Sequence, residues 1–577
     1  MPRAASVAAV VALAIAVAGC SGIPRDGEVR SVRPVVAPED RTELDRGPRN
    51  GPVFRRFPPP PPNASPEQVV RGFFDAHADI QPNQQVARQY LAPLEPWAAR
   101  AQVTVFTGER TFGIVPVDGT RQSATLTVTP TATISRDGEF RPVPTRPTVL
   151  RFGLRLVDGE WRLVDVPDGL LLSDSGLAGA YRRTVRYFPG PDRRRLVPDL
   201  VLLPRGSASA VTSAAQSVVD GPSPWLAPVV RTAVPESTAV IGAVPVIDGT
   251  ATVNLSRHAL SVLPAARAAL VAQLVWTLTE PGLGVGGVRL QVDGRRMVLP
   301  DGRTGAIQSR SDWAGFNPDP GSDSARLYFL RSGRLHTLEG EEVAEVRAEP
   351  AQLRDIAVSR SAALIAAVRR NADGTESLLV GALSGSLPAL VTGRRVLSPS
   401  WDSDGDRVWA LVDTVQGRTL MSVPAGGASG ASQAVPVDLP AGAVLESVRL
   451  SPEGGRAVLV LRTGAVRQPW LARVERLGGA PALAALQPVR PSGRDTASAV
   501  WETATRLLLV DGTEVARADA DGFDPVPVPS DGLPPRRVQR VTGGPSADVV
   551  AEIDGRLWRR ASGWRLIAPG TAAAYAG

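Results

Sequence analysis

The residue types that usually carry catalysis are few in this chain and lie far apart. Its 3 histidines, His77, His258 and His336, show none of the spacings of a metal site or a catalytic triad. The chain has no lysine, which excludes a phosphate-binding P-loop, and no clean G-x-S-x-G nucleophile elbow. We therefore expect no active site, metal or cofactor, and we interpret each histidine as a core or surface residue.

Two short motifs resemble ligand sites but occur in the wrong context. "GLGVGG" (Gly282–Gly287) follows a predicted helix and precedes a strand, the reverse of a dinucleotide-binding turn. "DSDGD" (Asp402–Asp406) could attract calcium, but its glycine is fourth rather than sixth and a strand follows at once. We expect a glycine-rich connection and a turn. The 57 acidic residues still leave a carboxylate pair for glycoside hydrolysis open.

The single cysteine, Cys20, can form neither an intramolecular disulfide nor a cysteine metal site. It follows Arg3, the apolar run Val7–Ala18 and Gly19, a pattern typical of a secretory signal whose run is too short to span a bilayer. "VAGC" resembles a bacterial lipobox. That resemblance implies a signal peptide over residues 1–19, cleavage after Gly19, and an N-palmitoyl, S-diacylglycerol cysteine; the alternative is an uncleaved signal with a chance cysteine.

The length of 577 residues predicts several domains. The formal net charge of +7 is small for this length, and no dense basic block with interleaved aromatic residues occurs, so we expect no nucleic-acid binding. Residues 20–62 have the composition of a tether and end in the prolines Pro58–Pro62, which favour extended polyproline II. Such a spacer would hold a folded body away from a lipid anchor; the alternative is a leader without that task.

Residues 63–176 predict an α+β domain. Ser65 and Pro66 begin a helix with apolar residues at helical spacing, and we expect a proline-punctuated helical hairpin near Tyr90 and Trp97. Four segments of alternating hydrophobicity follow, which indicates an antiparallel sheet. The order resembles NTF2-like domains, in which helices pack into a curved sheet, often around a pocket.

Residues 178–298 alternate strands and helices in a distinctive order. "YFPG" begins at Tyr187, "VDGP" ends a helix at Pro222, "IDGTATVNLS" places a hairpin turn at Asp248–Gly249, and a strong helix begins at Pro264. With the closing strand "VRLQVDG", the series resembles the GerMN domain of spore-germination proteins. That resemblance implies a module that binds peptidoglycan or protein partners, and it transfers no catalytic residue.

Residues 304–577 contain a loose repeat of two apolar strands around a polar turn. Ser359, Ser400, Ser451 and Trp501 mark successive copies, at steps of about 41, 51 and 50 residues. Repeats of this length with several strands each are typical of propeller blades. We predict about six blades, five to seven being compatible, with a β-sandwich array as the alternative.

The predicted fold class is therefore multidomain: two α+β units, NTF2-like and GerMN, followed by an all-β propeller. The expected blade loops carry arginines that suit bidentate contacts to carboxylates of a protein or a cell-wall polymer, although each could equally be a solvated surface charge. These are Arg369, Arg370, Arg394 and Arg395.

Over essentially the whole chain, this domain order resembles the LpqB lipoproteins of actinobacteria, and the Ala-, Gly-, Pro- and Arg-rich composition agrees. That family is linked to the Mtr two-component system, in which the lipoprotein is taken to contact and modulate the extracytoplasmic domain of the sensor histidine kinase. The resemblance implies a lipid-anchored, non-enzymatic protein on the extracytoplasmic face of the cell membrane. It further implies an effect on envelope homeostasis and division, with the kinase domain as the expected partner and peptidoglycan as a possible second one.

Two alternatives from other classes stay open. The first is a cell-wall glycan hydrolase with a carboxylate site in the propeller. The second is a solute-binding lipoprotein that uses the pocket of the NTF2-like unit.

Overall fold

The structure is a computed structural model. It describes residues 57–576, apart from short gaps at 80–81, 192–193, 207, 303, 320–325, 340–342, 344–351, 427–431, 478–479, 491–493 and 545–546. All described residues belong to one compact unit, Phe54–Gly577. Cys20, the signal peptide and residues 20–56 of the expected tether lie outside the described residues.

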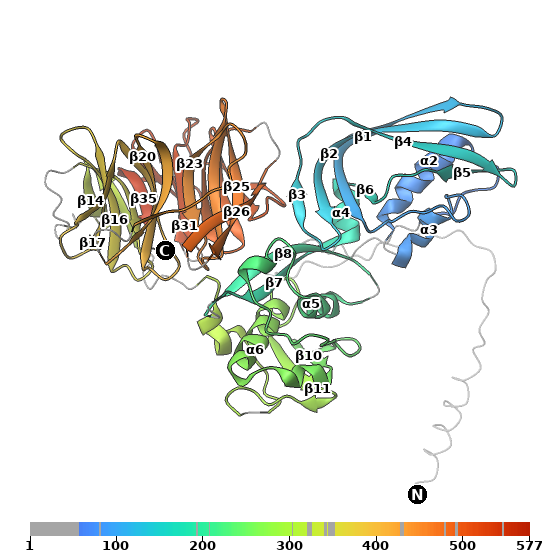
Figure 1. Cartoon of the computed structure of the whole chain (residues 1–577), viewed down its shortest axis with the longest axis horizontal. Helices are drawn as coiled ribbons and strands as arrows, with labels where there is room; N and C mark the ends of the chain where they lie inside the picture. Colours follow the sequence, from blue (N-terminus) through green and yellow to red (C-terminus); the bar gives the residue numbers. More distant parts are fainter. Residues whose placement is uncertain are drawn as a thin grey trace, which may run out of the picture. The chain divides into compact units, whose positions relative to one another are not determined.

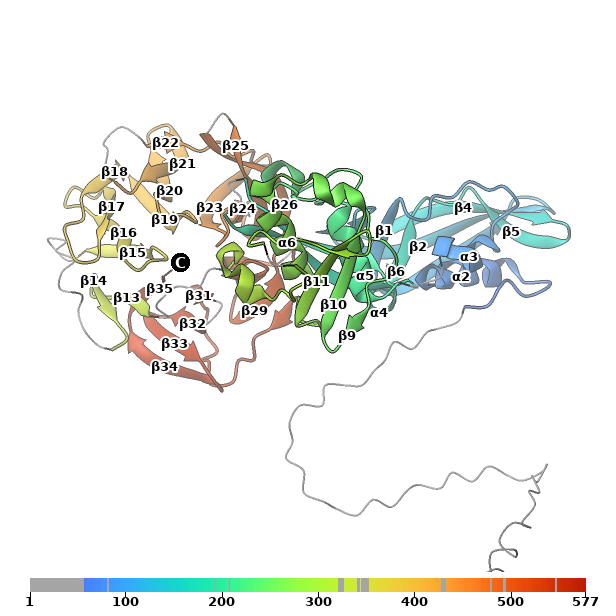
Figure 2. The ribbon, with the colours of Figure 1, turned by 90° about the horizontal axis from the view of Figure 1, so that it is seen from below.

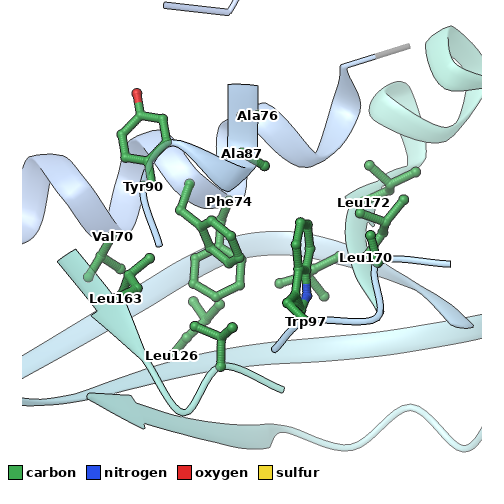
Figure 3. Packing of buried hydrophobic residues seen from close by; sticks show 14 of the residues in the cluster. Val70, Phe74, Ala76, Ala87, Tyr90, Trp97, Leu126, Leu163, Leu170 and Leu172 are labelled. Atoms are coloured by element: carbon green, nitrogen blue, oxygen red, sulfur yellow. The ribbon is translucent and has the colours of Figure 1, made fainter. Parts of the chain in front are cut away.

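The N-terminal domain packs a helix on one face of a bent sheet (Figure 1). Helix α2 (Pro66–Asp75) begins at Ser65, whose side chain accepts a hydrogen bond from the Gln68 backbone, while the Gln68 side chain accepts one from Ser65. Its apolar face, with Val70 and Phe74, lies over Leu126 and Leu163 of the sheet (Figure 3). The sheet order is β5-β4-β2-β1-β6, with β3 beside β2. The strands are β1 (Gln102–Pro116), β2 (Arg121–Ser135), β3 (Phe140–Pro142), β4 (Thr148–Val157), β5 (Glu160–Val164) and β6 (Leu170–Ser173).

Two expectations for this domain are wrong. The helical hairpin does not form: α3 (Gln85–Arg88) is a single turn, because Asn83 and Gln84 adopt left-handed φ values of 62° and 53° that interrupt the helical path. Tyr90 and Trp97 lie beyond any helix. The sheet is also not purely antiparallel, because β6 pairs with β1 in parallel and leads into α4 (Asp174–Ala180).

The end of the expected tether contacts this domain. Phe57 packs against its hydrophobic core, and the Tyr90 hydroxyl donates a hydrogen bond of 2.9 Å to the carbonyl of Pro58. The Ala64 amide bonds to the carbonyl of Pro61. The chain is therefore attached to the folded domain from the start of the proline run.

The second domain begins with the hairpin β7 (Tyr181–Pro189) and β8 (Leu196–Pro204). A four-stranded sheet of order β12-β11-β10-β9 follows, and α6 connects the parallel strands β10 and β11, since parallel neighbours need a crossover connection. Asp248 and Gly249 both have positive φ, 47° and 70°, as a tight hairpin turn demands. The elements are α5 (Ala210–Val219), β9 (Val246–Ile247), β10 (Thr250–Leu255), α6 (Pro264–Leu278), β11 (Gly287–Val292) and β12 (Arg295–Arg296).

A buried ion pair of the first hairpin links this hairpin to the "VDGP" segment at the end of α5. The Arg186 guanidinium lies 2.5 Å from Asp199 and also donates to the carbonyls of Ser217 and Gly221 in the "VDGP" segment. Asp199 in turn accepts bonds from the amide and hydroxyl of Ser223. One buried pair thus fastens the end of α5 to the first hairpin.

Six sheets form the C-terminal propeller, which confirms the prediction of about six blades (Figure 2). Five blades have four strands each and the sixth has three among the described residues. The strands are β13 (Leu327–Arg331), β14 (Arg334–Thr337), β15 (Leu353–Val358), β16 (Leu364–Arg370), β17 (Glu376–Ala382), β18 (Ala389–Gly393), β19 (Arg395–Trp401), β20 (Arg407–Thr414), β21 (Gly417–Pro424), β22 (Gln433–Ala434), β23 (Ala443–Leu450), β24 (Arg456–Thr463), β25 (Val466–Leu477), β26 (Ala480–Pro488), β27 (Thr496–Thr503), β28 (Arg506–Asp511), β29 (Glu514–Asp519), β30 (Val526–Pro527), β31 (Arg540–Gly544), β32 (Ala547–Ile553), β33 (Arg556–Arg560), β34 (Trp564–Pro569) and β35 (Thr571–Tyr575).

The ring closes through the last strand of the chain. Strand β35 pairs with β13, the first strand of the propeller, and forms the inner edge of that blade. The inner strands β15, β19, β23, β27, β31 and β35 contact one another around a complete circle. Successive blades therefore bury the faces that a single blade would expose.

The repeat is confirmed, although one of its sequence landmarks is displaced. The backbone amides of Ser359, Asp402 and Ser451 each bond to the carbonyl five residues further on, at 2.9, 3.0 and 2.9 Å. Asp402, two residues after Ser400, is therefore the structural equivalent in the second of these blades. An aspartate can accept these turn bonds as a serine does, which hid the equivalence in the sequence.

Polar contacts join the second domain to the propeller. Arg183 of β7 binds Asp519 at 2.9 Å and Asp521 at 2.7 Å, and Arg473 donates to the carbonyl of Trp225 at 2.6 Å. The Trp225 indole nitrogen donates to the carbonyl of Ala485 at 2.8 Å. These bonds connect segments that are more than two hundred residues apart in the sequence.

Candidate functional site in the propeller channel

A cavity of about 370 Å³ lies at the centre of the ring, lined by residues of all six inner strands. Every inner strand carries a β-bulge or register shift, at Leu353/Asp355, Leu397/Ser400, Leu445/Ser447, Thr496/Ser498, Thr542/Gly544 and in the pairing of β13 with β35. Because a bulge redirects the side chains that follow it, polar groups as well as apolar ones face the channel. The volume falls within the range of small-ligand pockets.

Two arginines from neighbouring parts of the wall face this cavity. Arg540 forms an ion pair of 2.6 Å with Asp355, and this carboxylate raises the pKa of Arg540. Arg449 donates instead to the hydroxyl of Ser398 and, at 2.9 Å, to the carbonyl of Val448. Among the residues that the structure describes, no carboxylate forms an ion pair with Arg449.

The carboxylates of the channel already have structural partners. Glu446 binds Arg462 at 2.6 Å, and Glu502 binds the Arg517 side chain at 2.8 and 3.0 Å. Asp402 accepts the amides of Asp406 and Arg407 in the turn after β19. The arrangement therefore favours recognition of a ligand over general acid–base chemistry.

At one mouth of the channel, the segment that leads into the propeller places Asp319 against the ring. Its carboxylate accepts the backbone amide of Ala504 at 2.5 Å. The pKa of Asp319 is raised to about 6, mainly by burial; Glu453 also raises it, whereas the Ala504 bond, Arg456 and Arg360 lower it. The ionised form of Asp319 is thus disfavoured in the folded protein.

We expect Asp319→Asn to raise the melting temperature by a few degrees at pH 7.5. Asparagine keeps the oxygen that accepts the Ala504 amide but removes a poorly solvated charge. Because the folded pKa lies above the ordinary 3.8, the native state binds more protons than the unfolded state between about pH 4 and 6, and its stability falls as pH rises through that window. The gain should therefore vanish near pH 4.

Thermal melts across that pH range test this expectation, with Asp524→Asn as the control at an exposed aspartate of the propeller. An equal effect of both variants, or a gain from Asp319→Asn that persists at pH 4, would contradict it.

The three histidines lie apart in the structure. His77 is buried between Phe73, Phe74 and Trp97, and its Nδ1 accepts the Leu171 amide at 2.9 Å. Burial lowers the pKa of His77 to about 3, so the ring is neutral. His258 is exposed, and His336 is a half-buried residue stacked on Phe329. His77 is thus a core residue and His258 a surface residue.

The two motifs that resembled ligand sites have structural roles. Gly282–Gly287 connects α6 to β11, and Asp402–Asp406 forms the turn between β19 and β20. Within the described part of the chain, no three His, Cys, Asp or Glu side chains gather as metal ligands. The blade arginines selected from the sequence lie on β16, between β18 and β19, or at the start of β19, and none of them lines the channel: Arg369, Arg370, Arg394 and Arg395.

Sequence reasoning missed the arginines that do line it, Arg360, Arg449 and Arg540. A signal was present for Arg449, which interrupts the apolar strand "ESVRLSP" just before the repeat landmark Ser451. A charge inside an otherwise apolar inner strand needs a polar partner or a cavity.

These features define a multidomain protein in which two α+β domains precede a closed six-bladed propeller with a polar channel. Three family models match it in the same order: "Lipoprotein LpqB, N-terminal domain" over residues 59–178, "Sporulation and spore germination" over 185–298, and "Lipoprotein LpqB beta-propeller domain" over 333–576. The chain belongs to the Lipoprotein LpqB family.

Relatives named Lipoprotein LpqB come from several actinobacteria. The Thermobifida fusca protein is 30% identical over 71% of this chain and 66% of its own length, and the Nocardia farcinica protein is 28% identical over 95% of this chain and 92% of its own. That name agrees with the lipobox-like motif at Cys20. No helix among the described residues has the length and apolar character needed to cross a membrane.

Solved structures resemble individual parts of the chain. The first GerMN domain of GerM from Bacillus subtilis is 24% identical over 23% of this chain and 99% of its own, with a TM-score of 0.20. TolB from Acinetobacter baumannii is 14% identical over 51% of this chain and 83% of its own, with a TM-score of 0.35.

Proposed function

We propose that the protein is a non-enzymatic accessory lipoprotein that binds the extracytoplasmic domain of a sensor histidine kinase of the Mtr type and modulates its signalling. Acylated Cys20 would hold it on the extracytoplasmic face of the cell membrane, and the segment before the first domain would space the folded body from the lipid. The kinase as partner comes from the family resemblance, and envelope homeostasis and division are the processes that such regulation would affect.

The observation that carries the proposal is the engagement of the channel carboxylates. A glycoside hydrolase needs one carboxyl group free to donate a proton and a second one free to attack or to activate water. Here Asp355, Glu446 and Glu502 each bind an arginine, and Asp402 and Asp319 accept backbone amides. This supports a binding protein over the hydrolase alternative.

A second supporting observation concerns the surfaces available to a partner. Ion pairs and hydrogen bonds from Arg183, Trp225 and Arg473 connect the second domain to the propeller. Because these bonds hold the two domains together, one partner can contact surfaces of both domains without a large loss of conformational entropy on binding.

Binding can be measured with the mature full chain in nanodiscs and the purified extracytoplasmic domain of the kinase in solution, by biolayer interferometry. We expect saturable binding, with empty nanodiscs as the control. No detectable binding at high micromolar kinase domain would overturn the proposal. Turnover of purified peptidoglycan that is abolished by one Asp or Glu substitution would favour the hydrolase instead.

A further inference from the structure

Small residues form part of the channel wall. Ala357, Ala497, Ala499, Ser447, Ser498 and Gly543 contribute to it from four of the six inner strands. The lining offers both apolar and hydroxyl groups to a ligand. A passage of about 370 Å³ can hold a short ligand but not a folded domain.

Among the described residues, no carboxylate forms an ion pair with the Arg449 cation of this wall. Arg540 is paired with Asp355, and the other carboxylates of the wall bind other arginines or backbone amides. Burial is the main cause that lowers the pKa of Arg449. The nearby Asp355 raises this pKa, and Arg540 lowers it. Behind Arg540, Glu552 accepts the Ala572 amide, and burial raises the pKa of this carboxyl.

The position of the Arg449 guanidinium is set by a strained residue. Ser398 has a left-handed φ of 56° within the bulge of β19. Its hydroxyl bonds to the amide and carbonyl of Val448 at 3.0 and 2.9 Å and accepts a further bond from Arg449. Strain of this kind persists where the surrounding structure holds it, and it clusters at ligand-binding sites.

We propose that the propeller channel is a binding site for a short, slender ligand with a terminal carboxylate, such as the carboxyl end of an extended peptide, which forms a charge-assisted bond to Arg449. A guanidinium matches a carboxylate in a bidentate geometry, and the bound anion would give Arg449 the ion-pair partner that it lacks among the described residues. This site goes beyond kinase binding and does not depend on it.

The two ends of the inner strands indicate through which mouth of the channel the ligand would enter. Asp319 and its bond to Ala504 occupy the mouth where the inner strands end. Asp355 and Arg540, near the beginnings of β15 and β31, mark the other mouth. The ligand would enter there and place its carboxylate on Arg449.

Isothermal titration calorimetry on the mature full chain in nanodiscs tests the site with a matched pair of probes. These are N-acetyl-tri-alanine with a free carboxylate and the same peptide as its C-terminal amide. We expect the acid to bind in the micromolar to millimolar range and the amide at least about tenfold more weakly, because only the acid offers an anion to the guanidinium. Inorganic phosphate is the third probe.

Arg449→Gln should weaken binding of the acid at least about tenfold and leave the amide unchanged, whereas Arg565→Gln, at an exposed arginine of β34, should change neither. The Ser398 hydroxyl keeps both bonds to Val448 without Arg449, so the variant retains its local support. The proposal fails if the acid does not bind at millimolar concentration, if acid and amide bind equally, or if Arg449→Gln has no effect. Phosphate that binds as tightly as the acid, with the same dependence on Arg449, overturns the carboxylate assignment.

Discussion

Replacing Arg456 with methionine is expected to destabilise the propeller by about 3–5 kcal/mol, because breaking a buried ion pair leaves an uncompensated charge in the interior. Arg456 is 1% exposed. Its guanidinium bonds to Glu453 at 2.8 Å and to the carbonyl of Ala504 at 2.5 Å, and it lies 5.1 Å from the ring centre of Trp501. The Glu453 side chain is fully buried and would lose its cation.

For a domain of this size the loss corresponds to a fall of roughly 10 °C in melting temperature, measurable by thermal unfolding. Adding Glu453→Gln to the Arg456→Met variant should recover part of the lost melting temperature, because it removes the buried charge that has no partner. Arg565→Met, at an exposed site, is the control and should melt within a degree or so of the parent chain. An Arg456→Met protein that melts like the parent would show that the pair contributes nothing to stability.

Replacing Cys20 with serine is expected to move the protein out of the membrane fraction. The thiol is the group that would accept diacylglycerol, and a hydroxyl does not substitute for it in a lipobox-like motif. One acyl chain gives only marginal membrane binding, whereas two or three give stable anchoring. The change should therefore shift most of the protein from the detergent phase to the aqueous phase on partitioning of cell membranes.

Ser21→Ala, at the adjacent position, is the matched control and should leave anchoring intact. Mass spectrometry of the N-terminal peptide would report the lipid mass on Cys20 in the parent chain and its absence in the variant. If Cys20→Ser stayed in the lipid fraction as firmly as the parent, the lipid-anchor interpretation would fall.

The parts of the fold that could be predicted are those with strong local signals. Pro264 and the long apolar stripe after it determine α6, and Asp248–Gly249 accepts the positive φ values that its hairpin turn needs. Strand β6 and helix α4 carry no comparable signal, because each is too short to show a period. The expected second helix is interrupted at Asn83 and Gln84, which adopt a left-handed backbone conformation that the sequence pattern did not indicate.

The candidate site was harder to predict than the fold, for a reason visible in the inner strands. Strand β23 has a register shift between Leu445 and Ser447, and beyond it the buried and channel-facing positions exchange. A sequence with period two predicts which residues share a face, but a single bulge reverses the assignment. The proximity of Arg449 to Ser398 is a tertiary contact across fifty residues that no local pattern encodes.

The closure of the ring by β35 has a consequence for the order of events in biogenesis. A polypeptide emerges from the ribosome and crosses the membrane amino end first, so β13 is delivered early and must wait for a partner strand that arrives last. The two preceding domains have their own cores and can mature during that interval. Loss of β35, by a nonsense codon or by proteolysis, would therefore leave the ring open while the two preceding domains are folded.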